Sequence, residues 1–203
     1  AYSSAQRLTT VSYNTSPVTK QTYLYENTSY PFALTGITDE NNKRYATWAY
    51  DDNGRAISSQ LAGGINFTSV TYDAATGNLL VKGPLGIVET YKFTMLQGVP
   101  KVTEIDRDAN GTVAFSSRNF SYDSNGYTKT ATDWNGNQTA YTNNSHGLPT
   151  QIVYASGSSV THTTNVTYDT TWVRLAKTIT TPGHHRHQQL RFQHRQSADP
   201  HPA

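Results

Sequence analysis

Short runs of alternating apolar and polar residues recur along this chain, separated by clusters of Asn, Asp and Gly. In the clearest run, at 87–95, every second residue except Glu89 is large and apolar. A period of two is typical of a β-strand with one buried face. We therefore expect Phe93 and Met95 to be buried and Lys92 to be exposed. Weaker runs predict further strands at 65–72, 99–105, 112–122, 150–154, 160–168 and 172–181.

The stretch from Tyr122 to Tyr141 carries two turn signals, at 123–126 and 133–136, on either side of an alternating run. Each ends in Asn-Gly, and a tight hairpin turn needs the positive φ that Gly adopts freely and Asn tolerates. The Asp that opens each turn can accept hydrogen bonds from its free N–H groups. The stretch therefore predicts one β-hairpin unit with a turn at each end.

This unit recurs at irregular intervals of about twenty residues or more, which indicates a repeat array. Tyr-Asp pairs open turns at Tyr50, Tyr72, Tyr122 and Tyr168, while the copy at 141–147 has Thr142 in place of Asp. The structural signature of the repeat turns comprises Tyr50, Asp51, Gly54, Tyr72, Asp73, Gly77, Tyr122, Asp123, Gly126, Asp133, Gly136, Asn137, Tyr141, Gly147, Tyr168 and Asp169.

The pattern resembles the RHS, or YD-repeat, family. The family signature, a Tyr-Asp-x-x-Gly turn followed by Thr-Asp-x-x-Gly-Asn-x-Thr-x-Tyr, is matched at 132–141, with its first half at 50–57 and 72–80. A further copy lies at 33–48, so the resemblance covers about 20–183. It implies an all-β array of antiparallel hairpins that forms a twisted, curved sheet, part of an RHS-type β-shell.

Function follows here from the resemblance rather than from any catalytic motif. We expect a non-enzymatic wall segment of a secreted or cell-surface protein. Its partners would be the remainder of its own shell and an encapsulated C-terminal toxin or effector domain. The start at Ala1, without Met or a signal-peptide pattern, is typical of a fragment or a processed product.

The amino-acid composition agrees with a β-protein and argues against several classes of function. Only 35% of residues are hydrophobic, but the chain has 14 Tyr, and β-branched and aromatic side chains favour strands. Cysteine is absent, which excludes disulfides and thiolate chemistry. No apolar run is long enough for a membrane helix. The net charge is +2, and residues 1–183 contain no cluster of basic residues. Nucleic-acid binding is therefore not expected.

Catalytic and metal motifs are few, and we expect no cofactor. The turn 106–111 has the Asp-x-Asp-x-Asn-Gly order of a Ca²⁺ loop, but Ser117 stands where that loop needs Glu, so a plain turn is the simpler interpretation. A glycosidase pair among Glu26, Glu40, Glu89 and Glu104 stays open, because folding can bring distant residues together.

Carbohydrate binding at a cell surface is the alternative function. Exposed Trp48, Trp134 and Trp172 on β faces would stack on sugar rings. Packing of aromatic rings between hairpins is the competing interpretation of the same residues.

The repeat pattern stops at Pro182-Gly183. We divide the chain into a partly ordered lead-in at 1–19, the repeat array at 20–183 and a His- and Arg-rich disordered tail at 184–203. Three interpretations of the tail stay open, namely a metal-binding His tract, an unstructured basic end, and a shifted reading frame or truncation junction. The break in mid-pattern favours the last.

Overall fold

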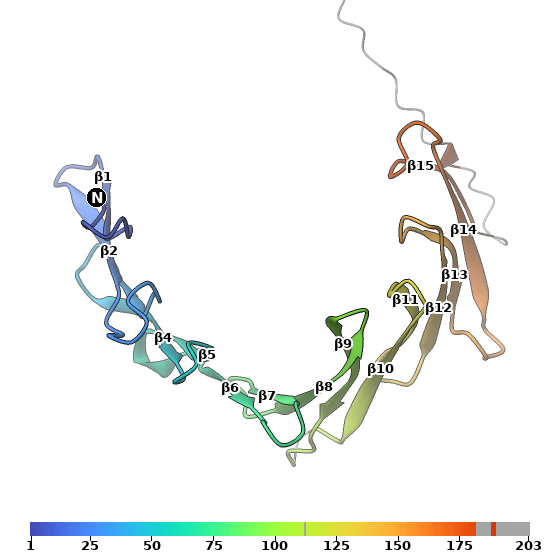
Figure 1. Cartoon of the computed structure of the whole chain (residues 1–203), viewed down its shortest axis with the longest axis horizontal. Helices are drawn as coiled ribbons and strands as arrows, with labels where there is room; N and C mark the ends of the chain where they lie inside the picture. The colour runs from blue at the N-terminus through green and yellow to red at the C-terminus, as the bar shows by residue number, and fades with distance from the viewer. Residues whose placement is uncertain (112, 182–187, 190–203) are drawn as a thin grey trace, which may run out of the picture. The chain divides into compact units, whose positions relative to one another are not determined.

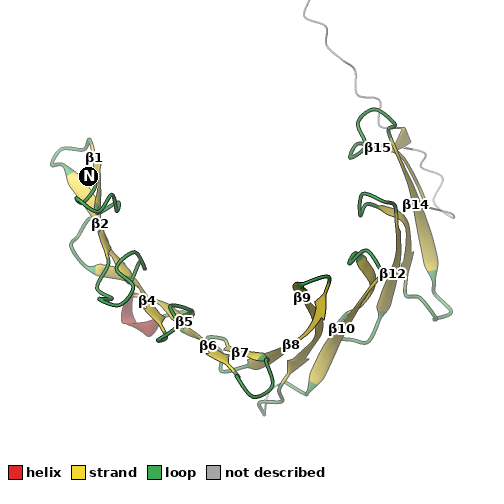
Figure 2. Cartoon of the chain, in the orientation of Figure 1, coloured by secondary structure: helices red, strands yellow, loops and turns green. Residues whose placement is uncertain are grey.

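A computed structural model describes residues 1–111, 113–181 and 188–189 of the chain (Figure 1). Apart from one short 3-10 helix, η1 (Ala62–Gly64), every regular element in these residues is a strand (Figure 2). The strands are β1 (Thr10–Tyr13), β2 (Thr19–Leu24), β3 (Gly36–Thr38), β4 (Arg44–Tyr50), β5 (Ala56–Leu61), β6 (Thr68–Tyr72), β7 (Leu79–Lys82), β8 (Val88–Leu96), β9 (Val99–Arg107), β10 (Ser116–Tyr122), β11 (Thr128–Thr132), β12 (Gln138–Asn143), β13 (Pro149–Tyr154), β14 (His162–Tyr168), β15 (Ala176–Thr180) and β16 (Gln188–Gln189).

The chain divides into two compact units, the first at Ala1–Ser117 and the second beginning at Arg118. Within each unit, strands that follow one another in the chain pair antiparallel, from β1 to β9 in the first and from β10 to β16 in the second. The predicted all-β array of antiparallel hairpins is therefore confirmed. The hairpin predicted at 122–141 is the pair β11–β12 with a turn before each strand.

Strand register gives the sheet of the first unit one apolar face. Leu79 of β7 lies opposite Tyr91 of β8, and Tyr91 lies opposite Ile105 of β9. Directly paired residues share a face, so these side chains form one apolar row across three strands. The neighbouring row, which includes Thr90 and Asp106, is more polar.

The second unit has the same two-faced construction. Tyr141 lies opposite Ile152, and Val166 lies opposite Ile179, all on one face. On the other face hydroxyl groups pair across strands: the Ser121 and Thr130 oxygens are 2.6 Å apart.

Few side chains are fully buried, because no second layer is seen over the sheet among the described residues. Ala46 and Ile105, 4% and 9% exposed, are the hydrophobic residues classed as buried there. The prediction that Phe93 and Met95 are buried is wrong, since they are 38% and 66% exposed. Alternation correctly predicts the strand but not that anything covers its face.

Lys92, expected to be exposed, forms ion pairs with two acidic side chains of the neighbouring strand. Its Nζ lies 2.7 Å from Asp106 and 3.3 Å from Glu104 on β9. The hydrogen bond to Asp106, and then that to Glu104, raise the pKa of Lys92. The lysine therefore ties the middle of β8 to its partner strand.

Several strands begin later in the sequence than predicted and are therefore shorter. The run predicted at 172–181 begins at Ala176, because Trp172 to Leu175 form a loop. The strand predicted at 65–72 begins at Thr68, and that at 160–168 begins at His162. The lead-in at 1–19 contains β1, which pairs with β2. Apart from β16, the tail at 184–203 lies outside the described residues.

Ile105→Asp and Phe93→Asp test this distribution of burial on neighbouring strands. A charge at buried Ile105 should lower the free energy of unfolding by about 3 kcal/mol or more, whereas the exposed site of Phe93 should lose about 1 kcal/mol or less. Urea denaturation of both variants measures this. Equal losses would contradict the burial pattern.

Candidate functional site: the tyrosine–aspartate edge

Antiparallel pairing in chain order sends successive loops to alternate ends of the strands (Figure 2). In each unit, every loop opened by a Tyr-Asp pair therefore lies at the same end. We call this end of the strands in each unit the Tyr-Asp edge; the word edge here means the strand ends and not an outer strand of the sheet. Its loops are 25–35, 51–55, 73–78 and 97–98 in the first unit and 123–127, 144–148 and 169–175 in the second. The opposite end, the Thr-Asp edge, carries the turns 39–43 and 133–137. The two halves of the repeat signature thus mark opposite ends of the strands.

The turn at Asp123 shows the local geometry. The Asp123 N–H donates to the Tyr127 carbonyl at 2.9 Å, and the Gly126 N–H donates to the Asp123 carbonyl at 3.0 Å. Asp123 Oδ1 accepts from the N–H groups of Asn125 and Tyr127 at 2.9 and 3.0 Å. Gly126 has a φ of 80°. This is a three-residue hairpin loop with a left-handed residue before the return strand, and one carboxylate oxygen satisfies two of its N–H groups.

The same arrangement recurs on both edges. Asp51 and Asp133 accept the equivalent pair of N–H bonds, at 2.8 to 3.0 Å. Asn137 adds a bond from its side-chain nitrogen to Asp133 Oδ2 at 3.0 Å. The loop at Asp73 is one residue longer, and there Thr76 also bonds the carboxylate.

In three turns of this kind the acceptor is not one of the residues of the repeat signature. In the copy at 141–147 the acceptor is Asn144, not Thr142: its Oδ1 accepts from the N–H groups of His146 and Leu148 at 2.9 and 3.0 Å. Asp39 opens another such turn, in which Asn42 takes the left-handed position with a φ of 59°. Ser3 opens a third. An Asx residue five positions before the first residue of the return strand, without any Tyr, is the signal that would find the first two.

Tyrosine hydroxyl groups connect successive loops of the Tyr-Asp edge. Tyr72 donates to the Ala56 carbonyl at 3.1 Å, just beyond the preceding turn of that edge. Tyr50 and Tyr168 likewise donate to the carbonyls of Leu34 and Pro149, at 2.8 and 2.9 Å. These three tyrosines of the signature therefore bond the hairpin before their own turns.

Two other tyrosines reach forward to the next turn of this edge. Tyr127 donates to the Ser145 carbonyl at 3.3 Å, and its ring lies so close to Gly147 that a Cβ there would be 2.5 Å from Cε1. Tyr30 makes the same contact with Gly54, at 2.8 Å from the corresponding position. Glycine is needed here for close approach as well as for its φ of 75° or 74°.

Arg55 links two turns at once. Its guanidinium pairs with Asp51 of its own turn at 2.7 Å and lies 4.0 Å from the centre of the Tyr72 ring. A cation over an aromatic face is favourable. The Tyr-Asp-x-x-Gly-Arg order therefore couples Tyr50-Asp51 to the following Tyr-Asp turn.

The hydrogen bonds in these turns lower the pKa values of several aspartates. The pKa of Asp51 is lowered mainly by the hydrogen bond from Arg55, that of Asp133 mainly by the bond from the Asn137 side chain, and that of Asp73 mainly by the Thr76 hydroxyl. Backbone N–H groups of Trp172 and Thr171 lower the pKa of Asp169. Burial raises the pKa of the Tyr122 hydroxyl. These aspartates act as ionised acceptors that hold turns.

Most of the residues predicted as candidates for catalysis or metal binding form ion pairs within the sheet. Glu26 pairs with Arg44 at 2.9 Å, Glu89 with Arg107 at 2.8 Å, and Glu104 with Lys92. Asp106 of the Ca²⁺-like loop is also paired with Lys92. Within the described part of the chain, no group of three or more His, Asp or Glu is placed to hold a metal ion. Tyr141 lies inside β12 rather than in a turn.

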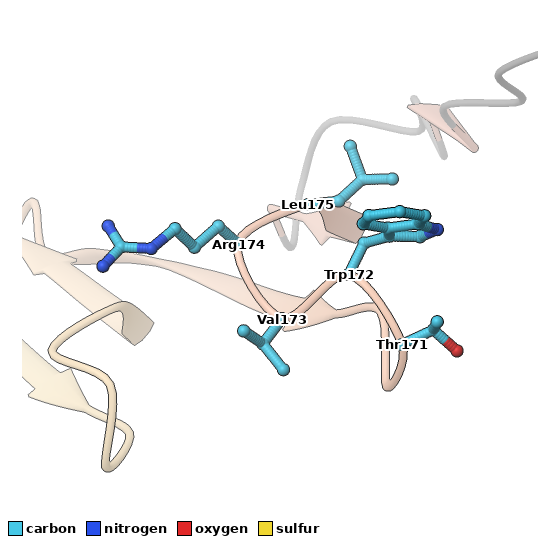
Figure 3. Close-up of a pocket in the computed structure, with 5 residues that line it drawn as sticks. All are labelled: Thr171, Trp172, Val173, Arg174 and Leu175. Carbon is cyan, nitrogen blue, oxygen red and sulfur yellow. The ribbon is translucent and has the colours of Figure 1, made fainter.

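The three tryptophans lie in different elements of the two units. Trp48 lies on β4 in the first unit, whereas Trp134 and Trp172 lie in loops at opposite edges of the second. Trp172 is 66% exposed and lines a pocket of about 540 Å³ with its neighbours in 171–175 (Figure 3). Figure 3 shows Arg174 pointing away from Trp172 and Leu175. Asp169 Oδ1 fixes this loop by accepting from the Thr171 and Trp172 N–H groups.

Comparisons with known proteins show the fold. No protein-family model and no curated protein sequence matches the chain. The crystal structure of TcdB2-TccC3-TEV is similar over 89% of this chain, with a TM-score of 0.65 and 14% identity. Those of TcdB2-TccC3-Cdc42 and TcdB2-TccC3 are similar over 81% and 84% of it, each with a TM-score of 0.59, at 13% and 15% identity. This chain spans only 9–10% of the chains it matches.

Among the described residues, no helix is long and apolar enough to cross a membrane.

Gly147→Ala and Gly136→Ala separate close approach from backbone strain. Both glycines have positive φ, but a Cβ on Gly136 would meet nothing within 4 Å. Gly136→Ala should cost about 1 kcal/mol of unfolding free energy for the strained φ. Gly147→Ala should cost about 1 kcal/mol more, because Tyr127 must move and lose its bond. In a Tyr127→Ala background the two costs should become similar, and a persistent difference would refute the contact.

Asp133→Ala and Asn144→Ala provide a matched test of the ionised acceptors. The folded pKa of Asp133 is lowered, so its contribution to stability is present above its unfolded pKa of about 3.9 and is lost as pH falls through the folded pKa. The destabilisation by Asp133→Ala should therefore shrink in acid, whereas that by Asn144→Ala should stay constant. Urea denaturation at pH 6 and at successively lower pH measures both. A constant cost at Asp133 would contradict the assignment.

Proposed function

We propose that this chain is a non-enzymatic segment of the wall of an RHS-type β-shell. The parent would be a secreted or cell-surface protein, and the shell would enclose a C-terminal toxin or effector domain. The observation that carries the proposal is the Tyr-Asp edge, where Tyr50, Tyr72 and Tyr168 each donate a hydrogen bond to the preceding hairpin. Such contacts extend a sheet one hairpin at a time.

Two further observations support a wall segment. The fold is similar to part of much longer chains, of which it spans 9–10%. In addition, each unit has an apolar face and a more polar face, which is rich in hydroxyl groups in the second unit, but few buried side chains. A sheet of this kind suits a wall whose faces meet different surroundings. The titratable groups, by contrast, are largely engaged in turns and ion pairs.

Limited proteolysis of the full gene product that carries this segment tests the proposal. We expect the C-terminal domain to resist protease in the wild type and to become at least tenfold more sensitive with Gly147→Val, which the contact with Tyr127 cannot accommodate. Lys129→Ala, at an exposed strand position, is the matched control and should retain the protection. A C-terminal domain that is equally accessible in all three proteins would refute the enclosing role.

Carbohydrate binding remains the second candidate, because Trp172 is exposed beside an apolar pocket. An aromatic ring in this setting can stack on a sugar. Glycan-array binding by the chain that disappears with Trp172→Ala would favour this function. Binding that is absent, or unchanged in the variant, would count against it.

A further inference from the structure

The hairpin of β8 and β9 is longer than β7, the strand that pairs with the other side of β8. The β7–β8 pairing ends with Leu79 opposite Tyr91. Pairing with β9 continues five residues further along β8, to Leu96 opposite Val99. Residues 93–96 of β8 therefore have no strand partner on the β7 side among the described residues. We call this segment the β8 arm.

Backbone directions identify the groups that face this open side. The Gly83 N–H donates to the Ile87 carbonyl, so Ile87 points its backbone groups toward β7. The Asp108 N–H donates to the Val88 carbonyl, which therefore faces the β9 side. Backbone groups alternate sides along a strand, and the Lys92 carbonyl, which accepts from the Thr103 hydroxyl of β9, keeps the alternation. Phe93 and Met95 thus direct their N–H and C=O groups outward.

The side chains of the same two residues are also accessible. Phe93 and Met95 lie opposite Val102 and Pro100 and are 38% and 66% exposed. The loop at 73–78 lies beside the start of the arm, but a Cβ built on Gly77 would meet no atom within 4 Å. The arm therefore offers apolar side chains and outward backbone groups at the same two positions.

We propose that the β8 arm binds an extended polypeptide segment by β-strand addition. Main-chain hydrogen bonds to Phe93 and Met95 would provide affinity, and their side chains would select apolar residues at alternate positions. Lys101 is the one ionisable residue between Phe93 and Thr103 in the sequence, which suits a segment that is uncharged at the positions opposite Phe93 and Met95. A lipid tail would leave the outward N–H groups unpaired. The inference concerns an additional contact and does not rest on the proposed shell.

The arm's own sequence is a suitable probe. In an antiparallel pairing of two copies, Phe93 would face Met95, and both residues direct backbone groups toward the partner. A peptide with the sequence of 92–96 should therefore form hydrogen-bonded pairs at both positions, with Thr94 opposite Thr94 and no like charges directly opposed.

Fluorescence polarisation of the labelled peptide with the chain tests the proposal. Wild type should bind it, and Met95→Pro should weaken binding at least tenfold, because it removes an outward N–H that no neighbouring strand uses. Phe93→Ser with Met95→Ser should weaken binding through the side chains. Val99→Ser is the control, since Val99 is 52% exposed on the same hairpin but lies outside the arm, and it should bind as wild type does.

Hydrogen exchange keeps the test decisive if Met95→Pro fails to fold. In the wild-type chain the Phe93 and Met95 amides should exchange quickly, and saturating peptide should slow them at least tenfold. The Thr94 amide, directed toward β9, should already be slow. Absence of binding at millimolar peptide, equal loss of binding in Val99→Ser, or no protection of the two amides would overturn the proposal.

Discussion

The whole arrangement depends on hydrogen bonds within the turns and between the residues next to them. In the turns at Asp39, Asp51, Asp123, Asp133 and Asn144, a single carboxylate or amide oxygen accepts from two N–H groups. Tyrosine hydroxyl groups connect some of these turns to neighbouring hairpins. An isolated hairpin is marginally stable in water. In a sheet that buries few side chains, contacts between adjacent hairpins must supply much of what a core supplies elsewhere.

This constraint explains why the signature has the residues it has. Asp is short enough to reach the N–H groups two and four positions later, and Gly accepts the left-handed φ. At Gly54 and Gly147 the tyrosine ring of a neighbouring loop adds a second requirement for glycine. Arg55 combines both tasks, since it pairs with Asp51 and covers the ring of Tyr72. Each hairpin thus interacts chiefly with its neighbours, as expected of a repeat array.

Much of the local structure could be predicted from the sequence, because turn chemistry is local. The turns at Asp51, Asp123 and Asp133 and the strands between them follow from Asn-Gly pairs and alternation. Alternation failed for Phe93 and Met95, because a period of two reports a two-faced strand and not what covers it. The Tyr-Asp pattern does not predict Asn144 as an acceptor, because an Asx oxygen at that position accepts the two N–H bonds without a Tyr directly before it. The role of the tyrosine hydroxyls needed coordinates, since their partners lie 16 to 19 residues earlier.

Native-state hydrogen exchange on Tyr72→Phe addresses the central claim most directly. The substitution keeps the ring under Arg55 and removes only the hydroxyl bond to the Ala56 carbonyl, worth about 1 kcal/mol. If edge contacts couple adjacent hairpins, amides of β5 and β6 should exchange about fivefold faster, while those of β12 to β14 stay unchanged. Unchanged exchange in β5 and β6, or equal acceleration in β12 to β14, would contradict the account.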